Sequence, residues 1–320
     1  MDNNIQNIQL LKKVIETDKK TVAIIGSGAS YFIGIPTWDE LLERMKTEFG
    51  CTDINIKESI LKQGYPKTAS IIYDKKGDSK LYIDFLCRQC TPTRGSFDSL
   101  HMQLINVFKK ILTTNFDTCF ENAYKNKCHP NKPRINIHCL PDFNIDKLSY
   151  NNNLVYLHGH KKKKVFIFKE EEYKNFYPTY YNTQNSSDLE EFLKIIFQIY
   201  NLVFIGFSFN DKAFVKYLRH VIQSEIKQKK DNFENLYGID YPRKVNKHRF
   251  VIISDEELSL EIQDQRKLNE NKERDTLFKD LDFKVITIRG QNFNDIGKIL
   301  EDIMERKYRV KKSTRGMAYV

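Results

Sequence analysis

The sequence has no run of 18 apolar residues, and its first ten residues, MDNNIQNIQL, contain no hydrophobic signal core. A helix that spans a bilayer needs about 20 apolar residues, and a secretory leader needs an apolar centre. We therefore expect a protein that is neither inserted in a membrane nor exported, and we assign it to the cytoplasm.

Cysteines are few and mostly isolated: there are six in 320 residues, and only Cys87 and Cys90 have the C-x-x-C spacing of a metal-binding pair. A structural zinc ion needs four ligands, and no second pair completes the set. The pair also lies in LYIDFLCRQC, a helix-like stretch. Reduced thiols without a metal are the favoured interpretation, so we predict no metal site.

The sequence has no RRM, KH, helix-turn-helix or zinc-finger pattern, although its net charge is +10. The positive charge gathers at 161–164 and at 306–312. A solvated loop and a frayed terminus explain these clusters without a ligand. The alternative is an acidic partner or a nucleic-acid complex. Direct nucleic-acid binding is the less favoured hypothesis, because no base-reading motif supports it.

What the sequence does contain is a glycine-rich loop after an apolar run, TVAIIGSGASYFIGIPTWD at 21–39. Glycines directly after a buried strand, here Gly26 and Gly28, let backbone N–H groups approach an anionic ligand, as in diphosphate sites of α/β sheets. The dinucleotide fingerprint has a third glycine where this chain has Tyr31. We therefore expect the chain to continue as a loop over the ligand until a helix begins near Trp38.

Three later apolar runs also end abruptly in polar or glycine residues: KILTTNFD at 110–117, LVYLHG at 154–159 and LVFIGFSFND at 202–211. In an open parallel sheet, ligands bind outside the carboxyl ends of the strands. Because these ends meet at one edge of the sheet, the four segments predict a single site.

Strand-like and helix-like segments alternate along the chain. After the first strand, further strands are expected near 110–113, 135–139, 154–158, 202–206, 249–253 and 283–288. This alternation predicts an α/β fold, a Rossmann-like parallel sheet with helices on both faces.

Helical periodicity is expected at 4–17 and at 38–48, and residues 53–108 have no convincing strand. We predict that 53–108 is a helical insertion packed over the site. The segment 227–248, rich in Lys, Asn, Asp and Gly, is expected to be an exposed loop. We expect one domain over the whole chain, ending in a basic tail from about 306 to 320.

The four motifs GSGAS…GIP, TTNFD, LHG and GFS…D occur in the order found in the sirtuin superfamily, and over residues 21–211 the sequence resembles Sir2-like proteins. The resemblance is closest to the bacterial branch that consumes NAD in defence against phage. It implies that the protein binds NAD and cleaves the nicotinamide–ribose bond.

The resemblance implies two catalytic residues. His158 would act as general base toward the ribose hydroxyls or water, for which a pKa near neutrality is suited; its structural alternative is a strand-end histidine bonded to a carbonyl. Asn115 would position the attacking water and contact the ribose, and its alternative is a helix cap or Asx turn. Asp117 matches an acid used against the nicotinamide carboxamide, and a first-turn helix acid explains it equally well.

The family's ribose- and phosphate-contacting element matches Gly206 and Ser208. Capping is the alternative, because Ser208 and Asp211 have the S-x-x-D spacing of a helix start, here at 211–226. Trp38 follows the loop as an aromatic lid. The residues expected to contact NAD are Gly26, Ser27, Gly28, Ala29, Ser30, Pro36, Thr37, Trp38, Thr114, Asp117, Gly206 and Ser208.

Three functions fit the resemblance: an NAD hydrolase, a protein deacylase or ADP-ribosyltransferase, and a non-catalytic NAD-sensing subunit. Deacylating sirtuins carry two C-x-x-C pairs after the LHG motif, whereas 160–200 here contains no cysteine, and Asp39 stands where they often have arginine. A pure binder would need neither Asn115 nor His158. We therefore predict an NAD hydrolase without a zinc lobe, with NAD as substrate and no metal.

Unrestrained NAD hydrolysis would kill the host, so such an enzyme must be inactive until it is triggered. We expect control by a homo-oligomer or by a separately encoded defence partner. Similar short Sir2-like proteins operate with a translocase ATPase, an Argonaute-like protein or a signal-producing enzyme. The apolar side chains of 53–108 exceed the needs of short helices and indicate a subunit contact; a core beneath the insertion is the alternative explanation.

Overall fold

The computed structural model describes eight stretches of the chain: 2–17, 20–127, 135–139, 152–182, 186–237, 248–254, 265–288 and 296–305. The helices are α1 (Asp2–Thr17), the 3₁₀ helix η1 (Ser27–Ile33), α2 (Trp38–Glu48), α3 (Ile56–Gln63), α4 (Tyr65–Asp74), α5 (Ser79–Gln89), α6 (Ser99–Val107), α7 (Cys119–Lys127), α8 (Glu170–Phe176), α9 (Pro178–Tyr181), α10 (Asp188–Ile199), α11 (Lys212–Tyr237) and α13 (Gln265–Asp280). The strands are β1 (Thr21–Ile25), β2 (Lys110–Thr113), β3 (Asn136–Cys139), β4 (Asn153–Tyr156), β5 (Gly159–His160), β6 (Val165–Phe166), β7 (Asn201–Ile205), β8 (Arg249–Ser254) and β9 (Phe283–Ile288). Residues 296–305 are also helical.

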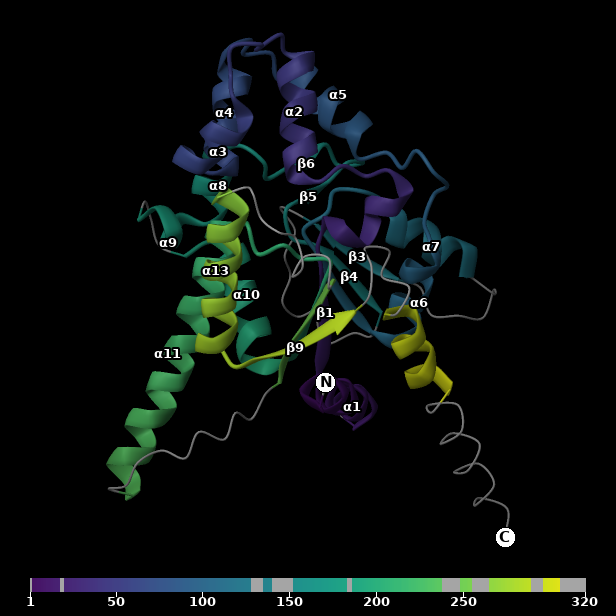
Figure 1. The fold of residues 1–320 in the computed structure, drawn as a ribbon, viewed down its shortest axis with the longest axis vertical. Helices are drawn as coiled ribbons and strands as arrows, with labels where there is room; N and C mark the ends of the chain where they lie inside the picture. Colours follow the sequence, from purple (N-terminus) through teal and green to yellow (C-terminus); the bar gives the residue numbers. More distant parts are fainter. Residues whose placement is uncertain are drawn as a thin grey trace.

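A seven-stranded parallel sheet forms the centre of the structure, in the order β3-β4-β2-β1-β7-β8-β9 (Figure 1). The chain moves to one side of β1 through β2 and returns to its other side with β7. Ile25 pairs with both Thr113 and Ile205, so these three strands end level with one another. The predicted α/β fold is confirmed, and β1 marks the switch point at which such sheets bind ligands.

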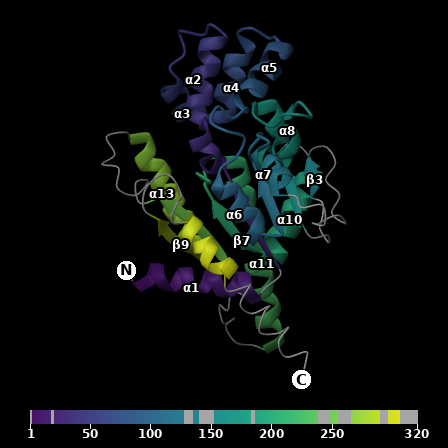
Figure 2. The same cartoon turned by 90° about the vertical axis from the view of Figure 1, so that its right-hand side faces the viewer.

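The two faces of the sheet enter separate cores. Val22 and Ile24 belong to one hydrophobic cluster, and Ala23 and Ile25 belong to the other. Helices α10, α11 and α13 pack on the first face, and α1, α6 and α7 pack on the second (Figures 1 and 2). Because both of their faces are buried, the central strands β1, β2, β4 and β7 are largely apolar, which is why their positions could be predicted within two residues.

Helix α1 protects the edge strand β9. Asn4 and Asn7 donate from Nδ2 to the carbonyls of Thr287 (3.0 Å) and Val285 (2.8 Å), and Thr287 N–H donates to Asn4 Oδ1 (3.0 Å). These bonds satisfy backbone groups that an open edge would expose. In both views α1 lies at the far end of the molecule from α2–α5. Among the described residues, no helix is long and apolar enough to cross a bilayer.

Helices α3 to α5 of the predicted insertion 53–108 pack with α2 over the carboxyl edge of the sheet, whereas α6, the last helix of that range, packs on the second face of the sheet. Thr37 starts α2 with a capping box: it accepts from Glu40 N–H, and its own N–H donates to the Glu40 carboxylate. The insertion has its own hydrophobic core, which includes Ile60, Tyr65 and Phe85. These side chains were candidates for a subunit contact, and their burial favours the alternative of a core beneath the insertion.

Two local predictions were wrong. The chain after Gly26 forms η1 instead of an open loop, because Ala29 N–H bonds back to Gly26 O (3.2 Å) and closes a 3₁₀ turn. Residues 227–237 continue α11 instead of forming a loop, since Lys, Gln and Glu are good helix formers. The rest of that loop, 238–247, and the basic tail 306–320 lie outside the described residues.

Candidate functional site

A pocket opens at the carboxyl edge of the sheet, where β1, β2, β4 and β7 end. A water-sized sphere can occupy about 60 Å³ of this pocket. Its wall includes Gly26 and Ser27 after β1, residues 114–116 after β2, His158 after β4 and Ser208 after β7. Four segments far apart in the sequence therefore meet around one cavity.

The residues expected at the site fall into two groups. The wall of the pocket includes Gly26, Ser27, Pro36, Trp38, Thr114, Asn115, His158 and Ser208. The others lie outside the wall: Gly28, Ala29, Ser30, Thr37, Asp117 and Gly206. Several members of the second group hold the first group in place.

The loop glycines are required by the protein's own backbone. Gly26 N–H donates to Ile205 O at 3.1 Å, and Gly28 N–H donates to Gly206 O at 3.0 Å. A Cβ on Gly26 would lie 2.3 Å from Gly206 O, and one on Gly206 would lie 2.5 Å from Ala29 N. The glycine pattern by itself predicts the close approach of a diphosphate. The structure shows instead that two protein segments approach each other, and that both N–H groups are already bonded.

One backbone donor of the loop remains open to the pocket. The N–H groups of Gly28 and Ala29 have carbonyl partners, whereas Ser27 N–H makes no hydrogen bond to the described residues. Ser27 also lines the cavity. Its N–H, at the start of η1, is therefore the donor with which the loop can bind an anionic group.

Asn115 is held in one orientation. Its N–H donates to Thr113 Oγ1 (3.1 Å), and its Nδ2 donates to Gly26 O (3.2 Å) and to Ser30 Oγ (3.4 Å). Because a carbonyl oxygen can only accept, the amide nitrogen must face Gly26. The Oδ1 atom has no partner among the described residues, and it is left as an acceptor for a water molecule or a ribose hydroxyl.

Behind Asn115, a buried chain of hydrogen bonds continues away from the pocket. Ser30 Oγ lies 3.2 Å from His101 Nε2, and His101 Nδ1 lies 2.7 Å from Asp98 Oδ1. Asp98 N–H also lies 3.3 Å from Nδ1, but the shorter contact is to a carboxylate, which can only accept. A proton on Nδ1 satisfies that contact, and Nε2 then accepts from the Ser30 hydroxyl. Ser30 thus supports Asn115 from behind the wall.

His158 is oriented by a carboxylate and two tyrosines. Its Nε2 lies 2.8 Å from Tyr177 Oη and 3.5 Å from Asp211 Oδ2, and the same Oδ2 accepts from Tyr173 Oη at 2.9 Å. A proton on Nε2 therefore has acceptors at hand, whereas one on Nδ1 would have none among the described residues. The tautomer that satisfies the buried ring leaves the Nδ1 lone pair free, as a general base requires.

Burial lowers the pKa of His158 below its ordinary value of 6.5, and the Asp211 carboxylate opposes the shift only in part. Burial disfavours the charged imidazolium because it removes the water that solvates it. His158 is 1 % exposed and is neutral at pH 7. It is thus in the protonation state that can accept a proton.

Asp211 has two roles, of which the sequence predicted only one. Its Oδ1 accepts from Phe214 N–H at 3.0 Å and caps α11, while its Oδ2 faces His158. Ser208 does not join this cap: its Oγ accepts from Asn210 N–H at 3.4 Å, and it lies exposed in the pocket wall. The capping interpretation is therefore right for Asp211 and wrong for Ser208. Tyr173 was missed altogether, because an aromatic residue on a short helix is indistinguishable from a core residue.

Trp38 forms an aromatic wall of the pocket. Its ring stacks on Phe168, with centroids 4.6 Å apart, and meets Tyr65 edge-on at 5.6 Å. The indole is fixed by packing on two sides. The remaining wall residues, most of them apolar and not predicted as NAD contacts, are Ile35, Leu41, Cys90, Phe116, Phe207 and Asp211.

The chain leaves β4 through a short hairpin. β5 and β6 pair antiparallel across the turn 161–164, so the lysine run is a hairpin turn. Lys162 pairs with the buried Glu121, whose other oxygen lies 2.5 Å from His160 Nε2. Burial alone would raise the pKa of Glu121, but His160 and Lys162 outweigh it and lower the pKa to about 2. These ion pairs connect the hairpin to α7. The hairpin leads directly to α8, and no zinc lobe occurs within 152–182.

The fold and the pocket define a doubly wound α/β protein with a ligand site at its switch point. The family model described as "SIR2-like domain" matches residues 109–275, just over half of the chain. The chain therefore belongs to the SIR2-like family, and the predicted superfamily is confirmed. Such a domain fits an NAD-related function. The matched range includes Asn115 and His158 but not the glycine loop. None of the curated proteins matches the sequence.

Proposed function

We propose that this protein is an NAD⁺ hydrolase, which cleaves the nicotinamide–ribose bond and yields nicotinamide and ADP-ribose. The observation that supports this best is the placement of Asn115 and His158 after the neighbouring strands β2 and β4, at one pocket with the glycine loop. Each side chain is oriented from behind by buried partners, and each has a free acceptor atom.

Cleavage of the nicotinamide–ribose bond requires few catalytic groups beyond these two side chains. Nicotinamide leaves as a neutral base from a cationic glycoside, so the site mainly has to stabilise an oxocarbenium-like ribose and present a nucleophile. Asn115 Oδ1 would hold the water that attacks the ribose carbon. His158 Nδ1 would take the proton of that water, while the electrons of the broken C–N bond go to the nicotinamide ring. Asp211 would stabilise the imidazolium that forms.

The hairpin after β4 supports water as the second substrate. Deacylating sirtuins are expected to bind a peptide between two lobes, and their second lobe carries zinc-binding cysteines. Here the chain passes from His158 to α8 through the short β5–β6 pair, and 160–200 contains no cysteine. A protein deacylase or ADP-ribosyltransferase is therefore the less favoured function.

We further propose that hydrolysis depletes cellular NAD in bacterial anti-phage defence, and that a separately encoded partner or self-assembly releases the activity. The order of the four motifs supports this proposal, together with the lethality of an unregulated NAD hydrolase. A non-catalytic NAD sensor is disfavoured, because it would not need the oriented pair Asn115 and His158.

The test is to incubate the purified full chain with NAD⁺, alone and with the product of the neighbouring gene, and to quantify nicotinamide and ADP-ribose by chromatography. We expect product without any acyl-lysine peptide. His158→Ala and Asn115→Ala should each lower the rate by about 100- to 10,000-fold, whereas His220→Ala, an exposed histidine on α11, should not. Full activity in His158→Ala would refute the proposal, and a requirement for an acetylated peptide would assign a deacylase.

A further inference from the structure

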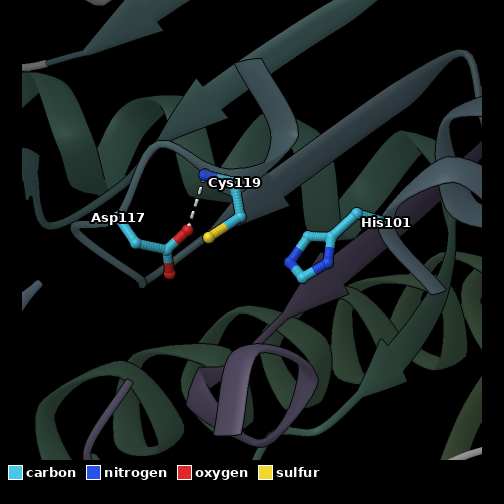
Figure 3. Close-up of side chains that lie close together, drawn as sticks. All are labelled: His101, Asp117 and Cys119. Atoms are coloured by element: carbon cyan, nitrogen blue, oxygen red, sulfur yellow. Dashed lines mark hydrogen bonds between the residues drawn. The ribbon is translucent and has the colours of Figure 1, made fainter. Parts of the chain in front are cut away.

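Behind the pocket, three side chains of metal-binding type converge from separate segments (Figure 3). They are His101 of α6, Asp117 in the loop after β2 and Cys119 at the start of α7. One donor atom from each lies within 4.8 Å of the other two. All three are buried, and Figure 3 shows the thiol beside the carboxylate, with the imidazole ring facing them.

Asp117 carries an oxygen that the protein leaves unsatisfied. Its Oδ1 accepts from Cys119 N–H at 2.9 Å, but its Oδ2 is buried and has no hydrogen-bond partner among the described residues. The side chain is 2 % exposed. Buried carboxylate oxygens are ordinarily paired with a donor or a cation, so this atom is open to a hydrogen-bond donor or a cation from outside the chain.

His101 has a carboxylate at its Nδ1 atom, which is the arrangement found in many metal-binding histidines. Its Nδ1 lies 2.7 Å from Asp98 Oδ1. With the proton on Nδ1, Nε2 is unprotonated and faces Ser30 Oγ at the edge of the cluster. A carboxylate on the outer nitrogen of a ligating histidine is the usual arrangement, because it fixes the tautomer and the ring.

A fourth donor is present. Ser30 Oγ lies 3.2 Å from His101 Nε2. With zinc bonds of about 2.0–2.3 Å, tetrahedral donors lie roughly 3.3–3.7 Å apart. The donor atoms lie within 4.8 Å of one another, so binding requires them to approach by at most about 1.5 Å.

We propose that His101, Asp117 and Cys119 bind a divalent transition metal, with Ser30 Oγ or a water molecule as the fourth ligand, and that Zn²⁺ is the ion that fits best. A thiolate and an imidazole select zinc-like ions, whereas Mg²⁺ and Ca²⁺ require oxygen ligands. The ion would join η1, α6 and the loop after β2 directly behind Asn115, whose Nδ2 lies 3.4 Å from Ser30 Oγ.

The test uses the full chain, stripped with a chelator and titrated with Co²⁺ as a spectroscopic probe. We expect one Co²⁺ per chain, a thiolate-to-cobalt charge-transfer band and the visible bands of a tetrahedral site, all abolished by added Zn²⁺. Cys119→Ala should remove the charge-transfer band, and Asp117→Asn should weaken binding at least tenfold. Cys51→Ala, which removes a buried thiol in the insertion, is the matched control and should leave the spectrum unchanged.

The wild-type chain decides the question even if a variant fails to fold. Absence of a cobalt spectrum would overturn the proposal, and it is the result expected if the free Asp117 oxygen serves only the nicotinamide carboxamide. A charge-transfer band that survives in folded Cys119→Ala and disappears in Cys90→Ala would also overturn it, because the thiolate would then belong to another site. The readout needs no NAD hydrolysis, so either failure leaves the proposed function untouched.

Discussion

Replacing Gly206 with alanine tests whether the glycine loop is held in place by the end of β7. Gly206 has φ +61°, and a Cβ there would lie 2.5 Å from Ala29 N and 3.0 Å from the carbonyl carbon of Gly28. These neighbours are backbone atoms and cannot rotate away. The loop must therefore shift as a unit, and the 3.0 Å bond from Gly28 N–H to Gly206 O must lengthen.

Two contributions set the size of the effect. A left-handed φ costs a non-glycine residue about 1–2 kcal/mol, and overpacking against fixed atoms costs about 1–3 kcal/mol more. We expect the free energy of unfolding of Gly206→Ala to fall by about 2–5 kcal/mol. Gly77 is the matched control, because its φ is +63° and no atom lies within 4 Å of its would-be Cβ. For Gly77→Ala, the free energy of unfolding should fall only by the cost of the left-handed φ, about 1–2 kcal/mol.

The assay is urea unfolding of both variants, combined with calorimetric titration of NAD⁺ into the folded proteins. Gly206→Ala should bind NAD⁺ more weakly, since the loop positions both Ser27 N–H and the Asn115 amide. Gly77→Ala should bind normally. If the two substitutions destabilise the protein equally and both bind NAD⁺ as the wild type does, the contact between loop and strand does not hold the site.

Three further predictions follow from the charges at and beside the pocket. Because burial lowers the pKa of His158, the base is active above that pKa, and kcat/KM should fall on the acid side with a midpoint below 6.5; a midpoint above 6.5 would contradict the assigned environment. Asp211→Asn should lower kcat, because asparagine still caps α11 at Phe214 N–H but cannot stabilise the imidazolium; it should also lower the free energy of unfolding in urea, since its amide nitrogen cannot accept from Tyr173 Oη as Oδ2 does. An unchanged kcat would remove Asp211 from the mechanism. Glu121→Gln should destabilise the protein by about 3 kcal/mol, because the neutral amide loses the attraction to His160 and Lys162 that lowers the pKa of the buried carboxylate from 4.5 to about 2. In the wild type the stability from Glu121 is complete above its ordinary pKa of 4.5 and is lost as the pH falls toward 2, so urea unfolding across that range should detect it and a flat profile would argue against these ion pairs.

The sequence by itself determined the sheet and the order of the segments that reach the pocket. Strands buried on both faces must be apolar throughout, so a run such as NLVFI at 201–205 identifies its own ends. The polar residues that follow, among them Asn115 and His158, are then placed at one edge by the parallel topology. These conclusions need only local patterns and one rule of sheet geometry.

The supports behind the site were decided by the tertiary structure. The meeting of Gly206 with the loop, the pair formed by His158 and Asp211, and the convergence of His101 with Asp117 all join segments more than ten residues apart. The one C-x-x-C pair offers no complete set of metal ligands, and spacing detects only ligands that are neighbours in the chain. Side chains that meet across a sheet edge are brought together by the strand order and by the crossover connections. No local sequence pattern encodes the strand order or the crossovers, so these side chains have no characteristic spacing.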